Sequence, residues 1–250
     1  MTLVLNRADL FRCSPDAVLF DTDNTLYPYE PAHKAAMDAV RVKAAMLFGI
    51  EKEKFDDTFY LARDAVKEQL SNTASSHSRL LYFQRMLEMM GLGSQVLLAL
   101  DMEQTYWRTF LGNAKLFEGV KEFLDDLRIA GIPTAIVTDL TAQIQFRKIV
   151  YFGLDNYFDY IVTSEEAGYD KPHPAPFEIA LQKMKPKGRC VWMVGDNPRT
   201  DIGGAKRAIN AVTIQKLHKG VIVGTAENEP DALIDNFQQL RHLLTRLVNE

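Results

Sequence analysis

The sequence predicts an α/β protein with a parallel sheet, in which a long helical insertion separates the first strand from the others. Residues 117–214 alternate short apolar runs with amphipathic segments, a pattern typical of βαβ units. Residues 32–111 show helical periodicity only, and they follow a single apolar run at 17–20. We therefore expect the first run and the later runs to share one sheet.

The expected elements follow from periodicity and from turn residues. Residues 1–15 should form an irregular or short helical lead-in that ends at Ser14-Pro15, and the prolines within 27–31 predict a linker. In the insertion we expect helices at 35–47, 54–70, 78–90 and 94–110, with a polar connection at 71–78. Elsewhere we expect strands at 16–20, 133–138, 160–163, 190–194 and 211–214, and helices at 120–130, 142–152, 174–184 and 198–209.

Composition limits the class of protein. The chain has 250 residues, 47% of them apolar, which is enough for a sizeable core. A net charge of −4 without a basic cluster argues against a nucleic-acid polymer as partner. The start lacks the pattern of a signal peptide, and no apolar run is long enough to span a membrane. We expect a soluble, cytoplasmic enzyme; its oligomeric state is not set by the sequence.

A pair of acids follows the first apolar run. Asp21 and Asp23 are two residues apart, so in an extended chain they point the same way, at the carboxyl end of the strand. Open α/β sheets bind their ligands at this end. Two close carboxylates favour either a bound cation such as Mg²⁺ or one acid that stays protonated. A polar loop in which one Asp caps a neighbouring group remains an alternative.

Three further polar signals fall at or after the ends of later expected strands. They are Thr138-Asp139, Lys171-Pro172, and the segment from Gly195-Asp196 to Asp201. Asn197-Pro198 fits a helix cap followed by a first helical residue, which leaves Asp196 at the strand end and Asp201 in the first turn. Each signal alone has a structural explanation. Together they predict one site at one edge of the sheet.

These motifs resemble the haloacid dehalogenase (HAD) superfamily of hydrolases, which carries an Asp-x-Asp-x-Thr motif, a strand-end Thr or Ser, a Lys and a Gly-Asp-x4-Asp motif in this order. The resemblance covers residues 16–236. It implies a Rossmann-like core of residues 1–29 and 113–250, with residues 30–112 as an all-helical C1 cap. The variant Asp-Asn-Thr-Leu-Tyr-Pro in the first motif is similar to the branch of pyrimidine 5′-nucleotidase-like phosphatases.

The resemblance implies a Mg²⁺-dependent phosphatase. Asp21 would attack phosphorus and form an aspartyl-phosphate, and Asp23 would protonate the leaving oxygen and later deprotonate a water. The metal site would comprise the carboxylates of Asp21 and Asp196, the backbone carbonyl of Asp23, and Asp201. Asp201 would bind the metal directly or through water, or orient a neighbour.

The remaining roles are also implied by the resemblance. Thr138 and Lys171 would hold the phosphoryl oxygens, and Thr25 would set the geometry of Asp23. At Asp139, where many relatives have Asn, we expect the backbone N–H to matter rather than the side chain.

The substrate is expected to be a small phosphorylated metabolite, such as a nucleotide or a sugar phosphate, with no membrane partner. Tyr27, His77 and Arg79 are candidates for contacting its leaving group. A phosphotransferase or phosphomutase remains an alternative, because an aspartyl-phosphate can also pass to an alcohol. A dehalogenase needs no acid at Asp23 and no metal, and a non-catalytic scaffold would be expected to lack a motif residue.

Overall fold

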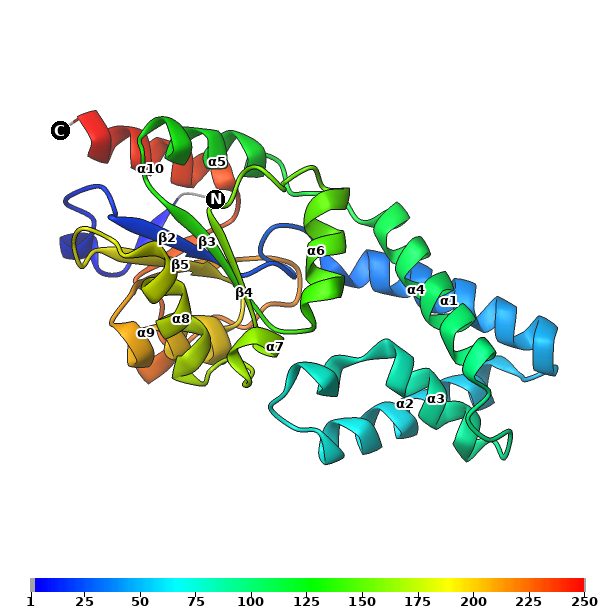
Figure 1. The fold of residues 1–250 in the computed structure, drawn as a ribbon. Helices are drawn as coiled ribbons and strands as arrows, with labels where there is room; N and C mark the ends of the chain where they lie inside the picture. Colours follow the sequence, from blue (N-terminus) through cyan, green and yellow to red (C-terminus); the bar gives the residue numbers. More distant parts are fainter. Residues whose placement is uncertain (1–2, 250) are drawn as a thin grey trace. The chain divides into compact units, whose positions relative to one another are not determined.

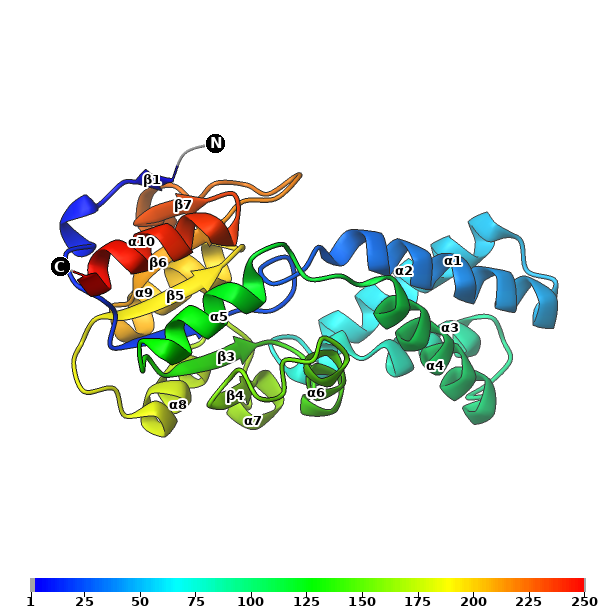
Figure 2. The ribbon, with the colours of Figure 1, turned by 90° about the horizontal axis from the view of Figure 1, so that it is seen from above.

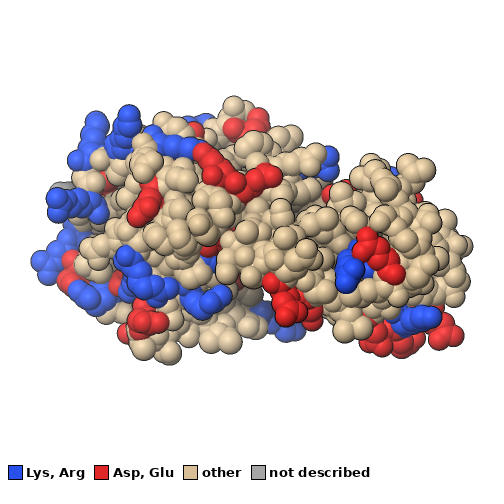
Figure 3. Space-filling model, turned by 60° about the horizontal axis from the view of Figure 1, so that its bottom comes forward, with Lys and Arg blue, Asp and Glu red and all other residues tan. Residues whose placement is uncertain are grey.

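A computed structural model of the protein describes residues 3–249. The chain divides into two compact units, one comprising the residues up to Pro28 together with those from Lys115 onward, and the other comprising Tyr29–Ala114. The first is an α/β unit and the second is wholly helical (Figure 1). On the face drawn in Figure 3, basic and acidic side chains are interspersed. Within the described residues, no helix is both long enough and apolar enough to cross a bilayer.

The α/β unit is built on one seven-stranded sheet with the order β1-β7-β6-β5-β2-β3-β4. All neighbouring strands run parallel except β1 and β7. The chain first moves outward from β2 to β3 and β4, and then returns to the other side of β2 with β5. The direction of winding therefore reverses between β2 and β5, which is where open α/β sheets bind ligands. The strands are β1 Val4–Leu5, β2 Ala17–Phe20, β3 Thr134–Thr138, β4 Tyr160–Thr163, β5 Val191–Gly195, β6 Val212–Lys216 and β7 Ala232–Ile234.

Helices cover both faces of this sheet, with α5 and α10 on one face and α8 and α9 on the other (Figures 1 and 2). Alternate residues of β2 serve the two faces: Leu19 lies in the cluster that contains Phe177 of α8, whereas the ring of Phe20 contacts that of Phe123 of α5. Because both faces are covered, all four residues of β2 are buried. The helices are α5 Val120–Ile129, α6 Ala142–Tyr151, α7 Ser164–Ala167, α8 Pro174–Met184, α9 Gly204–Ile209 and α10 Phe237–Asn249.

The helical unit contains α1 Tyr29–Phe48, α2 Lys52–Gln69, α3 Arg79–Met89 and α4 Val96–Asn113. Ser78 caps α3, since its hydroxyl accepts a hydrogen bond from the Leu81 backbone N–H at 3.3 Å. An aromatic cluster fills the interior, with the ring of Phe59 packed against those of Phe83 and Tyr82. These contacts place the apolar stripe of each helix toward its neighbours.

The predicted fold class is confirmed, while several local predictions are wrong. The lead-in contains strand β1, which pairs with β7, and neither strand was expected because each is only two or three residues long. The segment predicted as a linker is partly helical, since α1 begins at Tyr29 and Pro31 lies in its first turn, where its missing N–H costs little. Helix α10 was also missed, and the polar connection at 71–78 contains a short 3₁₀ turn at Ala74–His77.

Candidate active site

The residues at the carboxyl ends of β2, β3 and β5 come together because these strands are neighbours. Phe20 stands opposite Val194 in the parallel register, and the Asp21 backbone N–H donates to the Val194 carbonyl at 3.0 Å. Asp21 therefore leaves β2 level with Gly195, one residue before Asp196. On the other side of β2, Phe20 stands opposite Ile136, so Thr138 ends β3 at the same edge.

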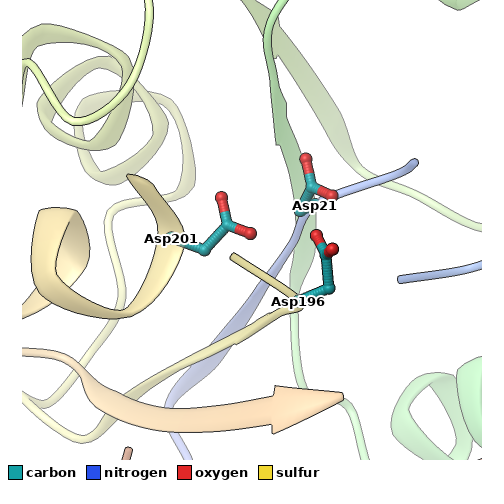
Figure 4. A group of neighbouring side chains, drawn as sticks. All are labelled: Asp21, Asp196 and Asp201. Atoms are coloured by element: carbon teal, nitrogen blue, oxygen red, sulfur yellow. The ribbon is translucent and has the colours of Figure 1, made fainter. Parts of the chain in front are cut away.

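Three carboxylates converge at this edge (Figure 4). Asp21, Asp196 and Asp201 each offer an oxygen within 4.8 Å of those of the other two. Burial raises the pKa of Asp21 to about 7 and that of Asp196 to about 8, and the neighbouring acids add to both effects. Carboxylates that resist ionisation together in this way suit a bound cation, and their hard oxygens suit a divalent one.

Lys171 supplies a positive charge inside the cluster. Its ammonium lies 2.8 Å from Asp21 Oδ1 and 2.7 Å from Asp201 Oδ1, and the side chain is buried. Burial opposes the charge, yet Asp201, Asp21 and Asp139 together hold the pKa of Lys171 well above its ordinary value. Lys171 is therefore a fixed cation beside the proposed nucleophile.

Asp139 positions Lys171 through its side chain. Its Oδ1 accepts a hydrogen bond from the Lys171 backbone N–H at 2.9 Å. The side chain of Asp139 thus has a structural partner, and the expected role of its backbone N–H stays a prediction. Burial raises the pKa of Asp139 to about 6, although the nearby Lys171 charge opposes this shift.

Asp201 is held by the turn that follows β5. Its Oδ2 accepts from the Asn197 N–H at 3.0 Å, while the Asn197 side chain caps the helical turn by accepting from the Arg199 N–H at 3.0 Å. Pro198–Gly203 form a π-helical turn, a feature often found at functional sites. A Cβ atom on Gly195 would lie 2.4 Å from Asp201 Cβ, so only glycine allows Asp201 to come this close to the strand end.

Asp23 faces a different cation. The ammonium of Lys148, in α6, lies 2.8 Å from Asp23 Oδ1 and 3.0 Å from Oδ2. The Lys148 side chain is 1% exposed, whereas that of Asp23 is 35% exposed. The Tyr27 hydroxyl also donates to Asp23, and the Tyr27 ring is buried against Phe152. The expected contact of Tyr27 with the leaving group stays a prediction.

The threonines of the site are joined in hydrogen bonds. Thr138 Oγ1 lies 2.8 Å from Thr22 Oγ1 and accepts from the Gln145 side-chain amide at 2.9 Å. Thr25 Oγ1 donates to Asp21 Oδ2 at 3.0 Å. The hydroxyl of Thr25 thus contacts Asp21 rather than Asp23, and the expected influence of Thr25 on Asp23 stays a prediction.

Gln215 in β6 and His218 in the loop after it support Asp196. His218 Nε2 lies 3.0 Å from Asp196 Oδ2, and the Gln215 side-chain amide donates to the Asp196 carbonyl at 2.8 Å. Carboxylates that bind metals are commonly held by such outer hydrogen bonds. The arrangement fixes the Asp196 carboxylate in place.

His77 and Arg79 belong to the helical unit. Arg79 Nη1 donates to the His77 carbonyl at 2.8 Å, and both residues line a cavity within that unit. They are thus close to each other, as their spacing in the sequence requires.

The chain matches the family model of haloacid dehalogenase-like hydrolases over residues 15–208. The protein belongs to this family. It is 38% identical over 200 residues to a ribulose-1,5-bisphosphate 5-phosphatase from Halopiger xanaduensis, covering 80% of this chain and 82% of that protein. It is 30% identical over 240 residues to a glyceraldehyde 3-phosphate phosphatase from Methanopyrus kandleri, covering 94% of this chain and 99% of the relative.

Solved structures of the family share the fold. A 2-haloacid dehalogenase from Pseudomonas syringae pv. Tomato superposes with a TM-score of 0.72 at 26% identity, covering 92% of this chain and 98% of that one. A HAD phosphatase from Thermococcus onnurineus gives a TM-score of 0.68 at 23% identity, covering 91% of this chain and 97% of that one. The predicted membership of the HAD superfamily is confirmed.

Sequence reasoning missed three residues that support this HAD site: Lys148, Gln145 and His218. Lys148 and Gln145 lie on the buried face of α6, three residues apart, at positions 148 and 145. Polar residues at core positions of a helix that follows a strand-end Thr were the available signal. His218 follows β6 in a loop, and no pattern in the sequence pointed to it.

Proposed function

We propose that the protein hydrolyses phosphate monoesters of small metabolites through an aspartyl-phosphate on Asp21, with Mg²⁺ as its metal. The observation that carries this proposal is that Asp21 and Asp23 each lie against a different lysine. Asp21 lies against Lys171 within the carboxylate cluster, whereas Asp23 lies against Lys148 outside it. One acid is thereby suited to bond formation and the other to proton transfer.

The cluster fits a divalent metal. Asp21, Asp196 and Asp201 would hold the ion, and the Asp23 backbone carbonyl would be a further oxygen ligand. Bound there, Mg²⁺ would neutralise charge on the phosphoryl group and on the three acids. The raised pKa values of Asp21 and Asp196 support this assignment, because they arise from burial and then from the neighbouring acids, and a bound cation would offset both effects.

The residues of the chain account for both half-reactions. An oxygen of Asp21 bonds to phosphorus as the bond from phosphorus to the leaving oxygen breaks, and Asp23 gives its proton to that oxygen. Asp23 then takes a proton from a water, whose oxygen attacks phosphorus and breaks the bond to Asp21. Lys171 and the Thr138 hydroxyl would hold the phosphoryl oxygens in both steps. Inorganic phosphate leaves, and Asp21 and Asp23 return to their starting states.

Lys148 acts in this scheme as a positioning residue. Its contacts with both oxygens of Asp23, together with the Tyr27 hydroxyl, limit rotation of that carboxyl group. A general acid must be held within hydrogen-bond reach of the leaving oxygen to be effective. Lys148 and Tyr27 would therefore fix the point at which the proton is delivered.

The helical insertion at 30–112 would serve as a cap that selects the leaving group, since the motif residues all lie in the α/β unit. The two relatives above are named for ribulose-1,5-bisphosphate and glyceraldehyde 3-phosphate, which supports a phosphorylated sugar or related small metabolite as substrate. The similarity to pyrimidine 5′-nucleotidase-like phosphatases stays a prediction.

One structural neighbour is a haloacid dehalogenase, so that chemistry must be weighed. Halide departs without a proton and carries no phosphate charge. A dehalogenase would therefore gain nothing from Asp23 with its buried Lys148, or from the cluster of three carboxylates. These residues favour the phosphatase.

The nucleophile provides the test. Wild-type protein with Mg²⁺ should hydrolyse p-nitrophenyl phosphate and sugar phosphates, and acid-quenched samples should show one phosphoryl group on the peptide that contains Asp21. Asp21→Asn should retain the fold by circular dichroism and lose both signals. Turnover of the Asp21→Asn protein above about 1% of the wild-type rate would contradict the proposal, because loss of a nucleophile costs several orders of magnitude.

A further inference from the structure

The helical unit contains a cavity of about 270 Å³ that is partly open to solvent and is lined entirely by residues of that unit. Its walls include the cations Arg63, Lys67 and Arg79, the histidines His33 and His77, and several aromatic rings. Glu30 is the one acid in the lining of this cavity as described. Three of the lining side chains are thus cations and one is a carboxylate.

Among these residues, Arg79 is contacted by several neutral groups. Its Nη1 donates to the His77 carbonyl at 2.8 Å, and its Nη2 donates to the Tyr29 hydroxyl. The guanidinium carbon lies 5.3 Å from the ring centroids of both Tyr82 and Tyr106. Among residues 3–249, no carboxylate forms an ion pair with Arg79, and its Nε–H is buried without an acceptor.

Arg79 is half-buried, and the contacts of its guanidinium described above are all with neutral groups. An arginine side chain stays protonated in proteins, so burial cannot be relieved by loss of the proton. Buried charges are ordinarily paired with an opposite charge. Aromatic faces and hydroxyl oxygens compensate in part, but they do not neutralise Arg79. An anion in the cavity would do so.

The other cations extend the positive field along α2. Arg63 and Lys67 are four residues apart and so lie on the same face of this helix. Arg63 pairs with the adjacent Asp64, whose side chain is 63% exposed, so solvent screens that pair and much of the Arg63 charge remains available. Across the cavity, the pKa of His33 falls to about 4, first through burial and then through the charges of Arg79, Arg41 and Arg63.

We propose that this cavity binds a phosphate group other than the one hydrolysed at Asp21. The phosphate group could belong to either of two ligands. It could be the second phosphate of a bisphosphorylated substrate, in which case the proposal rests on the proposed function. It could also belong to a separate phosphorylated effector, which would present the same chemistry. Arginine and lysine clusters are well suited to phosphate recognition. The volume lies just below the range of drug-sized pockets, so it suits a phosphate on a short carbon chain.

The test uses the full chain and leaves Arg79 intact, because its replacement could disturb the core of the helical unit. The double variant Arg63→Gln/Lys67→Gln removes two charges from the wall, and Lys54→Gln removes one exposed charge from the same helix as the matched control. Two sugar bisphosphates and their monophosphates would be assayed with Mg²⁺, with p-nitrophenyl phosphate as the generic ester.

If the second phosphate belongs to the substrate, wild-type protein should prefer the bisphosphate. The double variant should lower the ratio of its kcat/KM to that of p-nitrophenyl phosphate by about 10- to 100-fold, the range expected from the loss of charged contacts. Lys54→Gln should leave the ratio as in the wild type.

A second measurement covers a separate effector and does not depend on catalysis. In EDTA, inorganic phosphate should raise the unfolding temperature of wild type and of Lys54→Gln above that in chloride of equal ionic strength. The rise should be smaller in the double variant, which keeps only the phosphate grip beside Asp21. Phosphate binding in the cavity is supported if the double variant lowers either the kcat/KM ratio or the rise in unfolding temperature caused by phosphate. Absence of both overturns it, whereas lack of hydrolysis of every ester would instead overturn the proposed function.

Discussion

Lys148→Met should separate proton delivery from the rest of catalysis. Methionine keeps a long apolar stem in a site that is 1% exposed but removes the ammonium that contacts both oxygens of Asp23. A hydrogen bond to a charged group contributes about 1.5–3 kcal/mol. At 1.36 kcal/mol for each factor of ten, the expected loss is about 10- to 160-fold for a step that needs Asp23. This lies within the span of general acid catalysis.

The assay compares two leaving groups. An alkyl phosphate, such as a sugar phosphate, needs a proton on its leaving oxygen, whereas p-nitrophenolate leaves without one. Because kcat/KM covers only the steps up to release of the leaving group, the later role of Asp23 as a base does not enter it. Lys148→Met should therefore lower kcat/KM for alkyl esters by the factor above, and for p-nitrophenyl phosphate by no more than a few-fold.

Stability provides the control for this variant. The Asp23 side chain is 35% exposed, so water can solvate it once Lys148 is gone, and the midpoint of urea unfolding should change little. Arg147→Met, which removes an exposed charge from the adjacent position in α6, should leave both esters unaffected. An equal loss on alkyl and aryl esters would refute a role in proton delivery, and no loss on either would show that Asp23 needs no such support.

Further predictions concern the metal, the phosphate grip and pH. Exhaustive EDTA treatment should abolish hydrolysis, and added Mg²⁺ should restore it. Ca²⁺ should inhibit, since its looser coordination misaligns Asp21. Full activity in EDTA would refute the metal site. Lys171→Ala should depress kcat/KM for every ester alike, in contrast to Lys148→Met, and a loss that varied among esters would count against a grip on the phosphoryl group. Because burial raises the pKa of Asp21 to about 7 and of Asp196 to about 8, the folded metal-free protein binds more protons than the unfolded chain between about pH 4 and 8. Its free energy of unfolding should therefore fall as pH rises through that window. Stabilisation by Mg²⁺, measured by thermal unfolding, should be larger at pH 8 than at pH 5. Asp196→Asn should weaken both of these dependences on pH.

Much of the α/β unit could be predicted because its signals are local. Apolar runs such as Val191–Val194 are long enough to be recognised, and each ends at a polar motif whose position in a parallel sheet is set by topology. Strands β1 and β7 were missed for the opposite reason. Val4–Leu5 has no periodicity of its own, and it becomes a strand only because the backbone of β7 lies beside it.

The residues of the site likewise divide into those with a local signal in the sequence and those without one. The strand-end acids were predictable, whereas their supporting partners were not, because those partners are set by tertiary contacts. Lys148 is a cation on an amphipathic helix, where a solvated charge is the usual outcome, and it reaches Asp23 across 125 residues of chain. The sequence does not set whether the hydroxyl of Thr25 turns to Asp21 or to Asp23, and in the structure it donates to Asp21.

The position of the helical insertion also has a consequence for biosynthesis. Tyr29–Ala114 is one continuous segment, so all its residues are synthesised before any neighbour of β2 in the sheet. Strand β2 emerges first and must wait for β3 and then for β5. Lys171 follows Asp21 by 150 residues, and the last carboxylate of the cluster comes later still. Since domains generally fold as units during synthesis, the insertion can fold early, whereas the catalytic centre forms only once most of the chain has been translated.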